Sequence, residues 1–519
     1  MATGVARQSA EETAMATEVA PETEEKTVVF PDWVMLDRLG RTYIHADLDA
    51  AREAANKKKT AVEIVTATGH RCCLSFALSD RPEGISYLDL HWPPESSAKP
   101  AVVPYSLPAY PYVRATDEDL VLFDIDIDIN SPSDLFVYTA GPSPSVQRLP
   151  LYTGPSERPG CMRSNSKAGI LRLAGDHYIV SDLNVVWPNT EEGSDNYSMF
   201  AELCVFDSKT EKWAHFLRPQ QEILWSTDAV LAFDRQFICW VDYLMGVLLC
   251  DFSNLGSPVL QIVHFPGKAD YSEQVEVSRC LASRFRTVAV HQGMLLFVHI
   301  ENDYDGSCQR IETSRGQQQQ PPPQKITIWT LNLRENLRDG NSKSGWKIHR
   351  QINLHCLWAQ LDYQDLGIGQ RLPEFPVFCA KDPDALCCLL RDERKPSGQP
   401  WMIMIDMNHA YLRSCTEYIN ERPYGPYCTN AEAVKAHKNF FSNIPLLPTV
   451  FSKYLVRPTG IPRDNNKVTT PLEIISLQCE DEDLESGDWD RDILDFEIKD
   501  AVARCRQNQL NSANTTFMV

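Results

Sequence analysis

The sequence has few of the basic side chains that a nucleic-acid-binding protein needs. Lysine and arginine together number 50 against 70 aspartates and glutamates, so the formal net charge is −20. Contacts to phosphates require clustered lysine and arginine, and the one lysine run, Lys57 to Lys59, is too short to form such a patch. We therefore expect a partner that is a protein and not a nucleic acid.

Long apolar runs are also missing. The first 25 residues contain no apolar core of a signal peptide. The longest mostly apolar stretch, FICWVDYLMGVLLCD (237–251), is shorter than the roughly 20 residues of a membrane helix and has Asp242 inside it. These absences predict an intracellular protein, cytoplasmic and/or nuclear, that is neither secreted nor bound to a membrane.

The spacings that mark common catalytic sites are absent as well. The sequence has no G-x-x-x-x-G-K-[ST], no H-E-x-x-H and no G-x-S-x-G. Its 16 cysteines include no C-x-x-C pair, so the usual zinc spacing is missing. In a reducing compartment such cysteines are typically buried thiols and not disulfides. We expect no cofactor and assign no catalytic residue.

One acidic run could hold a metal ion. In FDIDIDIN, Asp124, Asp126 and Asp128 alternate with isoleucines, so an extended strand would place three carboxylates on one face. Such a face can bind a hard divalent cation. As an EF-hand loop the run fails, because Ile129 occupies the glycine position and Leu135 the glutamate position. A solvated strand edge or loop beside buried isoleucines is the favoured interpretation, and the three aspartates remain a weak metal candidate.

What the sequence does contain is a recurring pattern of an apolar run, a tight turn and another apolar run. The pattern occurs in ILRLAGDHYIV (170–180), VLAFDRQFICWV (230–241), VAVHQGMLLFV (288–298) and FCAKDPDALCCLL (378–390). Four-stranded units begin near residues 62, 112, 168, 226, 285 and 376. Four antiparallel strands per unit of roughly 40–50 residues are typical of propellers. We predict an all-β protein with a β-propeller of about six units, and two packed β-domains are the alternative.

The ends and one insert differ in composition from this body. Residues 1–27 are predicted to be a disordered acidic tail, and 28–478 the propeller-like domain. Residues 303–324, which include GQQQQPPPQ, are predicted to be a low-complexity loop. Residues 479–519 are predicted to be an acidic tail with a short helix.

The run 237–251 is best explained as a hairpin. Strands Phe237 to Asp242 and Val247 to Asp251 would be joined by a four-residue turn, Tyr243 to Gly246. Pairing Asp242 with Val247 would place Cys239 opposite Cys250, so the sequence predicts two neighbouring reduced thiols.

Four stretches of the sequence are distinctive: DWVMLDR (32–38), SDRPEGISYLDLHWP (79–93), DLFVYTA (134–140) and CWVDYLMGVLLCD (239–251). They resemble a plant family, greatly expanded in grasses, that is described only as domain of unknown function sixteen-eighteen. The resemblance covers most of residues 30 to 415. Leu244 and Met245 replace the aromatic or basic residues usual before the glycine. The family has no established activity, so the resemblance implies no catalytic residues.

The layout is also similar to the propeller-like domains that follow F-boxes in plant ubiquitin-ligase adaptors, which capture a protein on a loop face. Our leading hypothesis is therefore a non-catalytic interaction scaffold that binds a protein through its loop face. The alternative is an enzyme, for example a hydrolase with a site in the propeller channel. That alternative requires ionisable residues from different blades to converge on one concave pocket. A third, weaker hypothesis is an acidic co-regulator in the nucleus.

Overall fold

The computed structural model describes most of the chain between residues 30 and 455. The described residues are 30–81, 84–93, 110–125, 134–152, 167–186, 199–220, 225–266, 282–302, 324–335, 345–391, 398–422, 435, 438 and 446–455. The predictions for 1–27, 303–324 and 479–519 therefore lie outside these residues, apart from Gln324.

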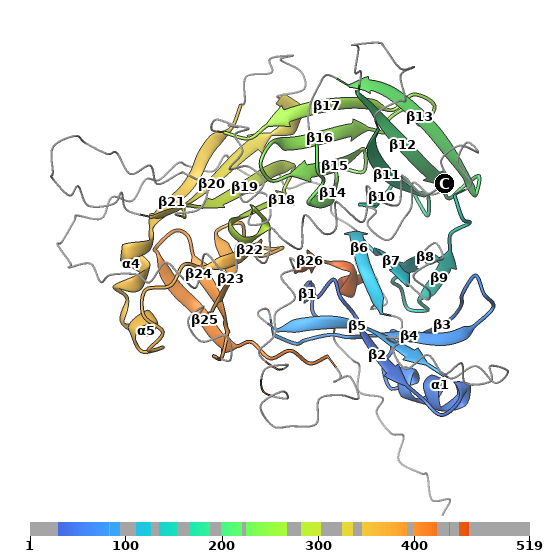
Figure 1. Ribbon diagram of the computed structural model, residues 1–519, viewed down its shortest axis with the longest axis horizontal. Coiled ribbons are helices and arrows are strands. Elements are labelled where there is room, and N and C mark those ends of the chain that lie inside the picture. The colour runs from blue at the N-terminus through green and yellow to red at the C-terminus, as the bar shows by residue number, and fades with distance from the viewer. Residues whose placement is uncertain are drawn as a thin grey trace, which may run out of the picture.

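Six sheets stand in a ring, so the chain is a six-bladed β-propeller, as predicted (Figure 1). Blades 2 to 6 are antiparallel four-stranded sheets whose strands follow one another in sequence. Blade 2 contains β6 (Pro111–Asp117), β7 (Leu120–Ile125), β8 (Asp134–Thr139) and β9 (Ser145–Arg148). Blade 3 contains β10 (Gly169–Arg172), β11 (Tyr178–Val186), β12 (Met199–Asp207) and β13 (Lys212–Gln220).

The remaining blades of this type repeat the same order. Blade 4 contains β14 (Ala229–Phe233), β15 (Phe237–Asp242), β16 (Gly246–Asp251) and β17 (Val259–His264). Blade 5 contains β18 (Arg286–His291), β19 (Met294–Ile300), β20 (Lys325–Asn332) and β21 (Lys347–Asn353), followed by helices α4 (Leu354–Trp358) and α5 (Leu361–Gln364). Blade 6 contains β22 (Glu374–Phe378), β23 (Ala385–Leu390), β24 (Trp401–Asp406) and β25 (Tyr411–Glu417).

Blade 1 closes the ring and has two more strands than the predicted four. It contains β1 (Val34–Leu36), β2 (Arg41–Ile44), helix α1 (Leu48–Asn56), β3 (Val62–Val65), β4 (Arg71–Ala77), β5 (Ile85–Trp92) and, from the other end of the described chain, β26 (Leu447–Thr449). The 3₁₀ helix η1 (Phe451–Leu455) follows β26. β1 pairs with β26 in antiparallel register and with β5 in parallel register.

A buried ion pair adds to this closure. The guanidinium of Arg422, after blade 6, lies 2.5 Å from the carboxylate of Asp37, after β1, and both side chains are almost completely buried. The two ends of the ring are thus held by backbone pairing and by a charge pair between residues 385 positions apart.

The connections of blades 2 to 6 define two different faces. In each of these blades, the connection from the first to the second strand and the connection from the third to the fourth strand lie on one face. We call it the tight-turn face because most of these connections are short. For example, β6 ends at Asp117 and β7 begins at Leu120. The second-to-third and blade-to-blade connections share the other, the long-loop face. There β19 ends at Ile300 and β20 begins only at Lys325. α4 and α5 belong to the long-loop face.

The hairpin at 237–251 exists, but its predicted register was wrong by one residue. Asp242 pairs with Gly246, so Ile238 lies opposite Cys250 and Cys239 opposite Leu249. Gly246 has φ +153° and belongs to the strand, not to the turn. A shift of one residue moves every side chain to the other face. Cys239 therefore packs toward blade 5 and Cys250 toward blade 3, and the two thiols are not neighbours.

Asp242 fixes this register. Its carboxylate accepts hydrogen bonds from the backbone N–H groups of Leu244 (3.0 Å) and Met245 (3.3 Å). It also accepts one from Ser226, at 3.0 Å. The aspartate that interrupts the apolar run is therefore a buried turn cap, which explains how it can lie within a mostly buried hairpin.

Most described cysteines match the prediction of buried thiols. Nine are free, and eight of these are buried. Burial raises the pKa of Cys239 to about 12, so this thiol stays protonated and unreactive. Cys356 is an exception because it is disulfide-bonded. Among the described residues, no helix is long and apolar enough to cross a membrane.

Candidate functional site

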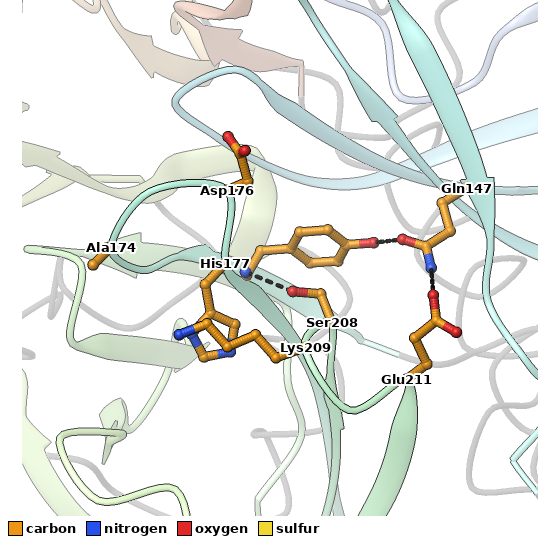
Figure 2. Close-up of a pocket in the computed structure, with 8 residues that line it drawn as sticks. Gln147, Ala174, Asp176, His177, Ser208, Lys209 and Glu211 are labelled. Atoms are coloured by element: carbon orange, nitrogen blue, oxygen red, sulfur yellow. Dashed lines mark hydrogen bonds between the residues drawn. The ribbon is translucent and has the colours of Figure 1, made fainter.

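An open pocket of about 330 Å³ lies on the tight-turn face, between blades 2 and 3 (Figure 2). Two turns of blade 3 and the outer strand of blade 2 form its walls. The residues that line it are Gln147, Ala174, Asp176, His177, Tyr178, Ser208, Lys209 and Glu211.

Hydrogen bonds hold most of the polar groups in this pocket. The Tyr178 hydroxyl donates to the side-chain oxygen of Gln147, whose amide nitrogen lies 3.5 Å from Glu211. The Ser208 hydroxyl oxygen accepts the Tyr178 backbone N–H at 2.9 Å. His177 lies 2.7 Å from Asp207, the residue before Ser208. Although burial disfavours the charged form, hydrogen bonds from the Lys209 N–H and from His177 lower the pKa of Asp207.

This pocket does not have the composition that the enzyme hypothesis requires. All lining residues except Gln147 come from blade 3, so ionisable groups of several blades do not converge in it. Among the described residues, no histidine is bonded to the Ser208 hydroxyl, so no activated nucleophile is formed there. The polar lining of the pocket is suited to polar surface contacts.

A series of ion pairs joins turns of the tight-turn face to turns or strands of other blades. Each pair connects side chains far apart in sequence. The pairs are Asp119 with Arg172, Glu118 with Arg235, Asp234 with Arg334, Asp384 with Arg350, and Lys381 with Asp32, which lies just before β1. Taken in that order, the first pair joins blade 2 to blade 3 and the second joins blade 2 to blade 4. The third joins blade 4 to blade 5, the fourth joins blade 5 to blade 6, and the fifth joins blade 6 to the start of blade 1.

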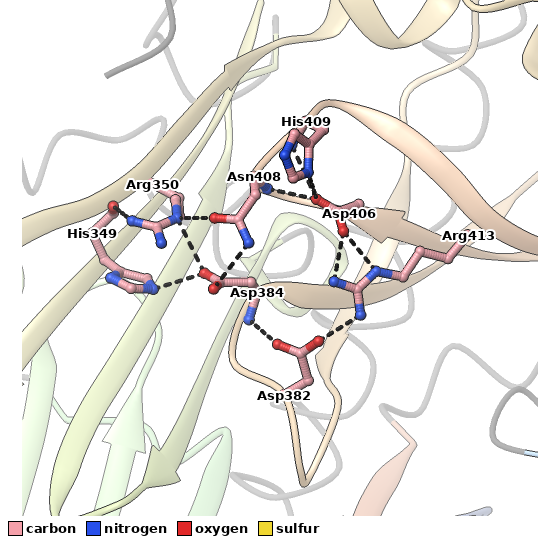
Figure 3. Close-up of polar contacts among 8 residues, drawn as sticks. All are labelled: His349, Arg350, Asp382, Asp384, Asp406, Asn408, His409 and Arg413. Carbon is pink, nitrogen blue, oxygen red and sulfur yellow. Dashed lines mark hydrogen bonds and ion pairs between the residues drawn. The ribbon is translucent and has the colours of Figure 1, made fainter. Parts of the chain in front are cut away.

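The link between blades 5 and 6 is part of a wider polar network (Figure 3). Asp384 accepts hydrogen bonds from His349, at 2.9 Å, and from Asn408, at 3.1 Å. Arg350 lies 3.2 Å from the same carboxylate. Burial opposes ionisation, but the bonds from His349 and Asn408 lower the pKa of Asp384. The outer strand of blade 5 is thus bound to a turn of blade 6.

Arg413 anchors the other half of this network. It donates to both Asp406, at 2.6 Å, and Asp382, at 2.5 Å. Burial alone would raise the pKa of Asp406, but the hydrogen bond and the positive charge of Arg413 outweigh this effect, so the pKa is lowered. Because the carboxylates in Figure 3 accept bonds from neighbouring cations or amides, the network fixes turns in place.

A hydrogen-bonded series in blade 1 resembles a catalytic relay. The Ser75 hydroxyl lies 3.0 Å from His91, and the other nitrogen of His91 lies 3.0 Å from His45. Ser75, however, is only 1% exposed. Burial lowers the pKa of His91 to about 4, which makes the imidazole a weak base. The series is therefore best explained as a way to satisfy buried polar groups.

The predicted metal candidate is only partly described. The side chain of Asp124 is 5% exposed, and its carboxylate accepts two hydrogen bonds from Arg114 on the neighbouring strand. Asp126 and Asp128 lie outside the described residues. Within the described residues, no group of three or more His, Cys, Asp and Glu side chains could hold a metal ion. The ion pair with Arg114 explains how the carboxylate of Asp124 can be buried.

Sequence reasoning missed Asp182, an unusual carboxylate in blade 3. It is completely buried on β11, one of its oxygens has no hydrogen-bond partner, and it lies opposite Cys204. Burial raises the pKa of Asp182 to about 7, against weaker effects of the Leu183 N–H and of Arg114. In YIVSDLN nothing distinguishes this aspartate from a surface residue, so the pattern carried no signal.

The comparisons with known proteins support the resemblance found in the sequence. The model of the family described as protein of unknown function (DUF1618) matches residues 240–387. This segment runs from β15 in blade 4 to β23 in blade 6 and includes most of the hairpin at 237–251. The family resemblance is confirmed for this part of the chain, while the plant origin stays a prediction. No curated protein matches the sequence.

Two solved structures show weak similarity. A crystal structure of cobalt-substituted Synechocystis ACO has 8% identity and a TM-score of 0.23, over 54% of this chain and 57% of that chain. The crystal structure of the WD40 domain of SCAP from fission yeast has 11% identity and a TM-score of 0.24, over 76% of this chain and 90% of that chain. Scores this low give no information on function.

Proposed function

We propose that this protein is a non-catalytic interaction scaffold that binds a partner protein through the long-loop face of its propeller. The observation that carries the proposal is the contrast between the two faces. On the tight-turn face, ion pairs between blades occupy many of the charged groups. The long-loop face carries the longer connections, and binding residues of rigid scaffolds are commonly found on such segments.

Helices α4 and α5 give the long-loop face a preformed surface. Asn353 caps α4 by accepting the N–H of His355 at 2.9 Å. The Trp358 indole donates to the backbone oxygen of Arg371 at 3.1 Å, which ties the segment back onto itself. Leu361 on α5 is nevertheless 74% exposed. An exposed leucine on an anchored helix is a suitable contact for a protein partner.

The described sites favour this proposal over the hydrolase alternative. The pocket of Figure 2 draws its ionisable groups from one blade, and the serine of the Ser75–His91–His45 series is buried. Neither arrangement combines an accessible nucleophile with a base of suitable pKa.

The proposal can be tested with two variants in the same blade. Leu361→Glu changes the long-loop face, and Ile348→Glu changes β21 near the tight-turn face, where Ile348 is 47% exposed. The tagged full-length protein and both variants are used to isolate partners from cells that express it, with quantification by mass spectrometry. We expect Leu361→Glu to lose the partner and Ile348→Glu to keep it. Loss with Ile348→Glu alone, or no partner above an empty-tag control, would contradict the proposal.

A further inference from the structure

The outer strand of blade 4, β17, has the free edge with the least protection in the described structure. Its sequence is VLQIVH, without a charged residue or a proline. The outer strands of the other five blades all carry charge: β3 is VEIV, β9 is SVQR, β13 is KWAHFLRPQ, β21 is KIHRQIN and β25 is YLRSCTE. Charges and prolines on edge strands prevent pairing with other chains.

The pairing of β17 with its neighbouring strand is also regular. Its six residues pair with β16 without a register shift, whereas bulges interrupt the pairing of β21 and β25 with their neighbours. Bulges twist an edge away from possible partners. A straight strand without a bulge presents its backbone groups in a row that another strand can match.

The outward-facing backbone groups of β17 can be identified from the ladder. The Phe265 N–H donates inward to Met245 at 3.2 Å, and inward bonds alternate along an antiparallel strand. Val259, Gln261 and Val263 therefore bond to β16, while Leu260, Ile262 and His264 point their N–H and C=O groups outward. The Trp346 indole donates to the outward C=O of His264 at 2.9 Å, which confirms the assignment.

The outward N–H and C=O groups of Leu260 and Ile262, and the N–H of His264, form no hydrogen bond with a described residue outside blade 4. Val259 is 63% exposed, and Leu260 and Ile262 are partly exposed. The edge therefore offers outward donors and acceptors together with apolar side chains on both sides of the strand.

We infer that β17 is a docking edge that adds an extended, basic peptide segment of a partner protein as a fifth strand of blade 4. Main-chain hydrogen bonds would supply affinity, and alternate apolar side chains of the peptide would pack against Val259, Leu260 and Ile262. This interaction surface lies on the rim of the ring and is separate from the long-loop face of the proposed function.

Charge selects the occupant. Asp251 lies opposite Val259 in the sheet, and its carboxylate is held by Gln236 and Ser253 without a cation among the described residues. These hydrogen bonds outweigh burial and lower the pKa of Asp251, so it stays charged. A lysine or arginine at one end of the peptide would meet this charge. A second copy of the chain, at net charge −20, would be repelled, and Trp346 already blocks one end of a symmetric pairing.

The experiment uses the full-length protein and a fluorescent peptide, Lys-Val-Thr-Val-Thr-Val-Lys, with anisotropy as the readout. Its controls are the same peptide with glutamates for lysines and one N-methylated on alternate residues, which cannot pair. We expect the basic peptide to bind and to protect the amides of Leu260 and Ile262 from hydrogen exchange. The acidic and N-methylated peptides should bind about tenfold more weakly or worse.

Ile262→Pro tests the edge in the protein. It removes an outward N–H and leaves the donors to β16 in place, so we expect about a tenfold or greater loss of affinity, with Ile262→Val unchanged. If Ile262→Pro does not fold, Asp251→Asn should still weaken the basic peptide selectively. Equal binding of all three peptides, or protection elsewhere than β17, would overturn the inference. So would a dimer of the free protein that Ile262→Pro dissociates, because the occupant would then be a second copy. None of these results depends on Leu361.

Discussion

The tight-turn face and the long-loop face are built from the same strands but are stabilised differently. On the tight-turn face, short connections bring side chains of different blades close together, and Arg–Asp and Arg–Glu pairs join them. On the long-loop face, Asp242 in blade 4 and Trp358 after blade 5 hold their own connections, and the ion pair of Arg284 with Glu374, which joins blades 5 and 6, is largely buried. The first arrangement suits a role in stability, and the second leaves the surface available for binding.

The largest change in stability is expected when Gly246, on the long-loop face, is replaced by alanine. A Cβ at Gly246 would lie 2.2 Å from the backbone oxygen of Val263, and φ is +153°. Gly246→Ala should lower the free energy of unfolding by more than about 3 kcal/mol, because neither strain nor overlap can relax easily. Gly175, in a tight turn at φ +64°, has no atom within 4 Å of such a Cβ.

Gly175→Ala is the matched variant. It should lower the free energy of unfolding by about 1–2 kcal/mol, the ordinary cost of placing a residue with a side chain in the left-handed conformation. Urea unfolding followed by tryptophan fluorescence measures both variants. A smaller effect of Gly246→Ala than of Gly175→Ala would contradict the view that the hairpin turn is the most constrained connection of the long-loop face.

A buried ion pair on the tight-turn face should come next. The side chain of Arg172 is 6% exposed and that of Asp119 is 19% exposed. Arg172→Met should cost on the order of 2 kcal/mol, below the ~3–5 kcal/mol of a completely buried pair, because Asp119 keeps some contact with water. The double variant with Asp119→Asn should recover part of this loss. If Arg172→Met folds well but loses the partner, the tight-turn face is a binding face.

Asp182 predicts a pH dependence. Since its pKa is about 7 in the folded state and ~3.9 in an unfolded chain, the folded state holds a proton that the unfolded chain has released. The free energy of unfolding contributed by this group therefore falls as the pH rises from about 4 to about 7. Asp182→Asn should raise Tm at pH 8 and leave it nearly unchanged at pH 4. An equal shift at both pH values would show that the carboxyl charge is not the cause.

The smallest effect is expected at an exposed pair of the tight-turn face. The side chain of Arg334, which pairs with Asp234, is 65% exposed. Arg334→Ala should lower the free energy of unfolding by less than about 1 kcal/mol, because solvent screens such pairs. A loss as large as that of Arg172→Met would mean that the pairs act as one coupled network, which a double-mutant cycle would measure.

Much of the fold could be predicted because it depends on local patterns. Unit starts near 62, 112, 168, 226, 285 and 376 match strands that begin at Val62, Pro111, Gly169, Ala229, Arg286 and Glu374, although the sheet of blade 1 itself begins earlier, at Val34. The turns Asp234–Arg235 and Gln292–Gly293 carry positive φ angles, as such reversals require. The closing strands β1 and β26 were missed, because nothing near Leu447–Thr449 indicates a partner at Val34–Leu36.

The register of the 237–251 hairpin and the partners of the ion pairs could not be predicted, because local patterns do not specify them. Both faces of the 237–251 hairpin are buried, so the apolar pattern does not specify its register. The pair Asp119–Arg172 joins residues 53 positions apart, and Arg422–Asp37 joins residues 385 apart. A single sequence does not show which charges meet across such distances, and only the ring brings them together.

Hydrogen exchange of the full-length protein, alone and with the partner isolated by the tagged wild type, tests the central claim most directly. The account predicts new protection in α4 and α5, with unchanged exchange in the turns Glu118–Asp119, Asp234–Gln236 and Gln292–Gly293. Protection of those turns, with α4 and α5 unaffected, would contradict the assignment of binding to the long-loop face.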